Sequence, residues 1–127
     1  MAAIKQFEQI QAWQTAREVT RQVYMLSNLG EFSRDFGLRD QIRRAAVSVM
    51  SNIAEGFESN TQALFINYLG RAKASAGEVR SQLYIAYDLG YLSKEQFNVL
   101  DEQIRKCSKQ VYRFMNYLNS QPNSRRF

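Results

Sequence analysis

The sequence predicts an all-α protein that folds as an antiparallel, up-down-up-down four-helix bundle. Four segments have apolar residues at helical spacing, the breaks between them are short, and turn-forming residues are scarce. The 127 residues include six glycines and one proline, Pro122. Short breaks place consecutive helices side by side and antiparallel. We expect one domain over residues 1–119, followed by a flexible basic tail over residues 120–127.

The first two helices are predicted from their apolar stripes. The first spans residues 8–29 and stops at Gly30, and the second spans residues 35–55 and stops at Gly56. In each helix the core residues recur every three or four positions, which keeps them on one face. These residues are Ala12, Ala16, Val19, Val23 and Leu26 in the first helix, and Leu38, Ile42, Ala45, Val49 and Ile53 in the second.

The third and fourth helices each begin at a predicted capping box. Ser59 or Asn60 caps the third helix, which ends before Gly90, and Ser93 with Gln96 opens the fourth, which runs to Asn119. Their core stripes are Phe65, Leu69, Ala72, Ala76, Val79, Leu83 and Ala86, and then Phe97, Leu100, Ile104, Cys107, Val111, Phe114 and Leu118.

The residue types needed for catalysis and metal binding are missing or isolated. The chain has no histidine, and its one cysteine, Cys107, falls on a core stripe. Without histidine, the common general base and the common metal ligand are both absent. We therefore expect no catalytic residues, no metal and no cofactor. No stretch approaches the ~20 apolar residues that span a bilayer, and no signal peptide is evident, so we expect a cytoplasmic protein without a membrane partner.

The positive charge is concentrated near the C-terminus. Residues 105–127 carry six Lys or Arg and no Asp or Glu, whereas the whole chain has a net charge of +5. Such an asymmetry indicates an anionic partner, RNA or DNA, although a solvated face that aids solubility is the alternative. The candidate nucleic-acid-binding residues are Arg105, Lys106, Lys109 and Arg113 on the fourth helix, and Arg43 and Arg44 on the second.

Two helices carry more apolar or small residues than one core face needs. An exposed apolar patch usually marks an interface, so we expect a homo-oligomer. The candidate interface residues are Val47, Met50, Ala54 and Phe57 on the second helix, and Ile66, Gly70, Gly77 and Tyr84 on the third. The alternative is that neighbouring helices of the same bundle cover both surfaces.

Polar residues at the edges of the second and third core stripes predict a hydrogen-bonded network between these helices. Buried charges need partners, and such networks fix the register of neighbouring helices. The predicted members are Gln41, Arg44, Asn52, Glu55, Glu78 and Gln82. An anion-binding pocket around Arg43 and Arg44 is the alternative.

The residues that carry these features resemble a known family. Residues 36–46 (FGLRDQIRRAA), 51–57 (SNIAEGF) and 72–83 (AKASAGEVRSQL) are similar to the signature of a bacterial four-helix bundle family first noticed as proteins encoded in 23S rRNA intervening sequences. The resemblance implies a small cytosolic bundle that assembles into a five-fold ring. A related branch, the accessory variability protein of diversity-generating retroelements, forms a basic barrel that binds nucleic acid and partners a reverse transcriptase.

The resemblance leaves two hypotheses of function. In the first, a ring, most simply a homopentamer, binds the backbone of RNA or DNA through its basic surface. In the second, the ring is an interaction scaffold that docks another protein, and the basic surface only aids solubility.

Overall fold

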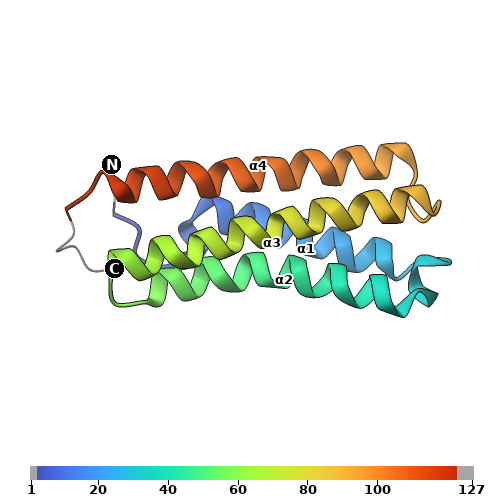
Figure 1. The fold of residues 1–127 in the computed structure, drawn as a ribbon, viewed down its shortest axis with the longest axis horizontal. Helices are drawn as coiled ribbons and strands as arrows, with labels where there is room; N and C mark the ends of the chain where they lie inside the picture. The colour runs from blue at the N-terminus through green and yellow to red at the C-terminus, as the bar shows by residue number, and fades with distance from the viewer. Residues whose placement is uncertain (1–2, 123–127) are drawn as a thin grey trace.

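The computed structural model describes residues 3–122, and within them it confirms the predicted all-α four-helix bundle (Figure 1). The helices are α1 (Gln11–Ser27), α2 (Phe36–Glu58), α3 (Gln62–Asp88) and α4 (Lys94–Asn119), with short 3-10 helices η1 (Phe7–Gln9) and η2 (Phe32–Arg34). Consecutive helices run in opposite directions. The α1–α2 and α3–α4 connections therefore lie at one end of the bundle, and the α2–α3 connection lies at the other. Residues 123–127 of the predicted tail lie outside the described residues.

Each helix of the bundle packs against its neighbours in the sequence, and α4 also packs against α1, so that the four helices enclose one core. The contact between α2 and α3 is the most extensive of the four. All residues of the predicted core stripes are buried except Leu26 and Phe114, which are partly buried against the core. Burial of one apolar stripe per helix is the main favourable contribution to a fold of this kind.

The helix starts differ from the prediction where capping groups were ambiguous. Helix α1 begins at Gln11, because the preceding residues form η1, whose turn is closed by the side chain of Gln9. The Ser93 capping box is confirmed, since the Ser93 hydroxyl accepts a hydrogen bond from the amide of Gln96 at 3.1 Å. The box at Ser59 is wrong. Ser59 follows the end of α2, and Thr61 caps α3 by accepting from the amide of Leu64.

Gly56 does not end the second helix, because α2 continues to Glu58. The glycine instead allows α3 to approach closely. A β-carbon at Gly56 would lie 2.8 Å from Cδ1 of Phe65 and 2.9 Å from Cβ of Tyr68. By contrast, Gly30 (φ 51°) and Gly90 (φ 77°) take the left-handed conformation in the two connections at the opposite end, which favours glycine.

Replacing Gly56 with alanine should lower the free energy of unfolding by about 1–3 kcal/mol, because the added methyl group overpacks the contact with Phe65 and Tyr68. Gly77→Ala is the matched control. Apart from its chain neighbours and the backbone of its own helix, no atom lies within 4 Å of a β-carbon at Gly77, so this change should raise stability by up to about 1 kcal/mol through helix propensity. Urea unfolding followed by circular dichroism measures both. Equal stability of the two variants would contradict the close approach at Gly56.

Candidate nucleic-acid interface

Three cations of α4 form what we call the basic face: Lys106, Lys109 and Arg113. They point to solvent because the buried residues Ile104, Cys107 and Val111 hold the opposite side of α4 against the core. Each of the three side chains is exposed, and none makes a hydrogen bond or an ion pair within residues 3–122. The basic face therefore keeps its full charge toward solvent.

Arg105 differs from the basic face because it is paired. Its Nε donates a hydrogen bond to Oδ2 of Asp101 at 2.8 Å, and this contact raises the pKa of Arg105. The Oδ1 atom of Asp101 also lies 3.5 Å from Nε of Arg80 on α3. The carboxylate of Asp101 thus sits between two guanidinium groups. It partly neutralises the positive charge of Arg105, which was predicted to bind nucleic acid.

Two residues that sequence reasoning missed lie beside the basic face. Lys73 on α3 and Tyr112 on α4, together with Ser108 and Lys109, line an open cavity of about 290 Å³. Both side chains are exposed. Lys73 and Lys109 are distant in the sequence and meet because α3 packs antiparallel against α4. The cations near α4 therefore come from two helices.

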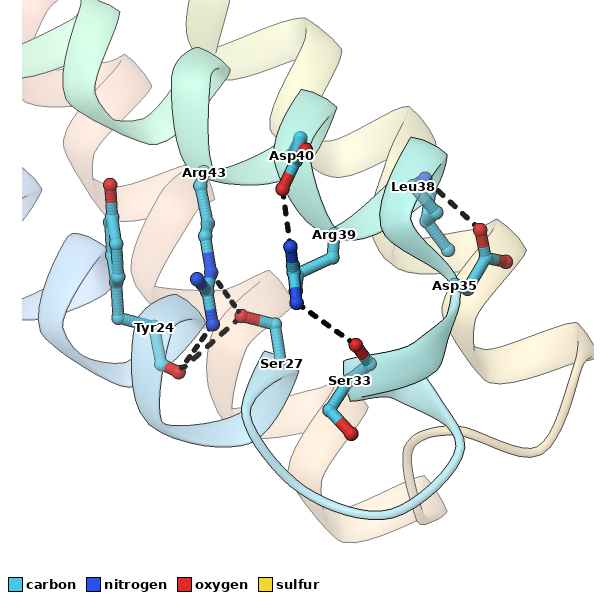
Figure 2. A network of polar contacts seen from close by, with 8 residues as sticks. All are labelled: Tyr24, Ser27, Ser33, Asp35, Leu38, Arg39, Asp40 and Arg43. Atoms are coloured by element: carbon cyan, nitrogen blue, oxygen red, sulfur yellow. Dashed lines mark hydrogen bonds and ion pairs between the residues drawn. The ribbon is translucent and has the colours of Figure 1, made fainter.

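Arg43 and Arg44 are not brought together with the basic face, because α2 lies across the bundle from α4. Arg43 connects α2 to α1 (Figure 2). Its Nε donates to Oγ of Ser27 at 2.8 Å, and its guanidinium lies 4.6 Å from the ring centroid of Tyr24. Ser27 is fully buried, so Arg43 satisfies a polar group that water cannot reach. The donors of Arg43 thus serve the fold.

Further polar contacts hold the start of α2 at the same end (Figure 2). Asp35 caps the helix by accepting from the amide of Leu38 at 3.2 Å. Its other oxygen accepts from the hydroxyl of Tyr91 at 2.9 Å, which raises the pKa of Tyr91. Arg39 donates to the carbonyl of Ser33 at 3.0 Å. Asp35 thereby ties the α1–α2 connection to the α3–α4 connection.

The predicted network between α2 and α3 is wrong in its central members. Glu55 and Glu78 are exposed, and neither makes a hydrogen bond or an ion pair in the described part of the chain. The observed link joins Oγ of Ser48 to Oγ of Ser75 at 2.9 Å, and Asn52 donates to Ser48. Three other predicted members line an open cavity of about 340 Å³ together with Ser48 and Glu78: Gln41, Arg44 and Gln82.

The predicted oligomer surface is only partly available. Phe57 is wrong as an interface residue, because it is 7% exposed and packs edge-on against Phe65 in the core. Met50 and Ile66 are partly buried against the core, and the remaining residues face solvent to different degrees. These remaining residues are Val47, Ala54, Gly70, Gly77 and Tyr84. Among them, the Tyr84 ring already contacts Phe97 at 4.9 Å between centroids.

Cys107 has the surroundings of a core residue. Its thiol donates to the carbonyl of Ala12 at 3.4 Å, and burial raises the pKa of Cys107 to about 12. A thiol that stays protonated is a poor nucleophile. Within residues 3–122, no three His, Cys, Asp or Glu side chains gather to hold a metal ion. None of the helices in this range combines the length and the apolar character that crossing a membrane requires.

Comparison with known proteins gives a family match and a structural match. The family described as 23S rRNA-intervening sequence protein matches residues 8–113. A crystal structure from Bacteroides thetaiotaomicron, described as a protein with unknown function from the S23 ribosomal protein family, is 24% identical. The match covers 83% of this chain and 95% of that one, with a TM-score of 0.76, which indicates the same fold. A comparison with curated proteins finds no match.

Replacing Arg43 with alanine should destabilise the bundle by about 1–3 kcal/mol, because the buried Ser27 hydroxyl keeps its own donation to the carbonyl of Tyr24 but loses the donor from which it accepts. Arg44→Ala is the control, since Arg44 is exposed and has no partner in the described residues. It should change stability by less than about 0.5 kcal/mol. Thermal unfolding measures both changes. If Arg43→Ala unfolds at the same temperature as the parent protein, the contact of Arg43 with Ser27 does not stabilise the fold.

Proposed function

Because the chain belongs to the 23S rRNA-intervening sequence protein family, we propose that it is a non-enzymatic, ring-forming bundle that binds the phosphate backbone of RNA or DNA. The observation that carries the proposal is the basic face itself. Lys106, Lys109 and Arg113 are exposed and unpaired within residues 3–122, and Glu102, one turn before Lys106, makes no ion pair with it. Cations that a fold leaves unpaired are available to phosphates.

Binding of this kind is electrostatic. Each cation that contacts a phosphate releases condensed counterions, so the affinity falls steeply as salt rises. Contacts to phosphates fix position on the nucleic acid but carry no sequence information. Three cations on one subunit support only weak attachment. We therefore expect affinity to depend on strandedness and salt more than on base sequence, and to increase when several subunits act together.

Self-association would bring several copies of the basic face together. Val47 is 39% exposed and Ala54 is half-buried, and both lie on the outer flank of α2, away from the basic face. We expect this flank to form the subunit contact. The resemblance to ring-forming proteins favours a homopentamer. In such a ring, five copies of the basic face act on one nucleic acid, and the effective concentration of each additional contact is high.

An interaction scaffold is the second candidate, and one observation favours it. Large apolar side chains are exposed at the end that holds the α1–α2 and α3–α4 connections: Leu29 is 59% exposed, Phe36 62% and Leu89 53%. Exposed apolar groups that gather at one end are typical of protein-binding surfaces. A scaffold without nucleic-acid binding would show no retention of RNA or DNA at low salt.

Replacing Lys106, Lys109 and Arg113 together with glutamine should weaken nucleic-acid binding and flatten its dependence on salt. The slope of log affinity against log salt should decrease by about two to three, since three phosphate contacts are lost. Filter binding at several salt concentrations gives this slope for each protein.

The control removes the same charge elsewhere, through glutamine at Lys5, Arg34 and Lys94, three exposed cations whose side chains make no hydrogen bond, ion pair or cation–π contact in the described residues. This control should keep most of the affinity. If both triple variants lose affinity equally, net charge rather than the basic face is responsible. If neither variant differs from the parent, the basic face serves solubility alone.

Val47→Glu should dissociate the oligomer, because a charge placed in an apolar contact is costly to bury. Light scattering at micromolar concentration should give the parent a mass several times the 14.8 kDa of the chain, and the variant a mass near that of the chain. Val99→Glu, at an α4 position that is 49% exposed, is the matched control and should keep the parent mass. A monomeric parent would refute self-association altogether.

A further inference from the structure

Tyr112 is an aromatic residue on α4 for which the fold has no evident use. It is 54% exposed, and no ring contact or cation–π contact engages it within residues 3–122. Other exposed tyrosines are engaged. Tyr84 packs on Phe97, and Tyr24 lies under the guanidinium of Arg43. The ring of Tyr112 is therefore free to stack on a ligand.

Cations from two helices line the same cavity as this ring. Lys109 lies one turn before Tyr112 on α4, and the packing of α3 against α4 brings Lys73 to the same open cavity of about 290 Å³. Ser108 completes the lining with a hydroxyl group. Neither lysine has a partner in the described part of the chain. An aromatic ring that shares a cavity with two free ammonium groups can take up a base while the ammonium groups contact phosphates of the same strand.

Two glycines flank Lys73 along α3. Gly70 lies one turn before Lys73 and Gly77 one turn after it. A β-carbon at Gly77 would meet no atom within 4 Å, and one at Gly70 would meet only Cε of Met115, at 3.8 Å. No side chain therefore projects from these two positions next to Lys73.

We propose that Tyr112, Lys73 and Lys109 form a stacking site that selects single-stranded over double-stranded nucleic acid. This inference rests on the proposed function and specifies its ligand. In a duplex, the faces of the bases are covered by their neighbours in the stack, so Tyr112 cannot reach them. In a single strand, one base stacks on Tyr112 while adjacent phosphates contact Lys73 and Lys109. Every base has such a face, so the selection is for strandedness and not for sequence.

The test compares two probes, a fluorescein-labelled oligothymidine and a blunt DNA duplex of the same length, by fluorescence anisotropy at several salt concentrations. Tyr112→Ala should bind the single strand roughly ten-fold more weakly and bind the duplex as the parent does. Tyr112→Phe should keep the parent affinity, because it keeps the ring. Tyr87→Ala, at an exposed tyrosine near the end of α3 that is far from Lys73, is the control and should change neither affinity.

Salt dependence separates stacking from charge at the same site. Tyr112→Ala should leave the salt slope for the single strand unchanged, whereas Lys73→Gln should reduce it by about 0.7, the loss of one phosphate contact. A parent protein that binds the duplex as tightly as the single strand overturns the inference, as does Tyr112→Ala binding like the parent. In both cases the proposed function stands if loss of the basic face still weakens binding. A parent protein that binds neither the single strand nor the duplex contradicts both the stacking site and the proposed function.

Discussion

The close approach of α2 and α3 at Gly56 is the constraint on which the rest of the bundle depends. With no side chain between them, the two helices pack tightly enough for Ser48 and Ser75 to share a hydrogen bond farther along the same contact. At the start of α3, the buried Gln62 donates to the carbonyl of Leu118 and thereby attaches the end of α4. This bond helps to fix the position of α4 along α3, and therefore brings Lys73 and Lys109 to the same cavity.

The core could be predicted from the sequence because burial follows the helical repeat, and this repeat is a property of each helix alone. The end of α2 could not be predicted, because the sequence does not distinguish a glycine that ends a helix from one that lets a neighbouring helix pack closely. The network around Glu55 and Glu78 failed for a related reason. A helical wheel gives the direction of a side chain but not the distance between two helices. At the distance observed, the short side chains of Ser48 and Ser75 make the link, whereas Glu55 and Glu78 are exposed.

The candidate site was predictable only where one helix supplies it. The charge of Lys106, Lys109 and Arg113 could be read from α4, since nothing from another helix neutralises them in the described residues. The pairing of Arg105 is an exception, because its partner Asp101 lies one turn before it on the same helix and the sequence alone contains this pair; only the second contact of Asp101, with Arg80 of α3, depends on packing. The contribution of Lys73 depends on the register between α3 and α4, and this register is a product of packing that no local pattern encodes.

The burial of Cys107 has a practical consequence for work on this protein. A thiol enclosed by the core, hydrogen-bonded to Ala12 and protonated at neutral pH reacts with maleimides only when the bundle opens. A cysteine introduced at an exposed position can therefore be labelled selectively without removing the native one. The rate at which the native thiol is modified in the folded protein then measures how often the four helices separate.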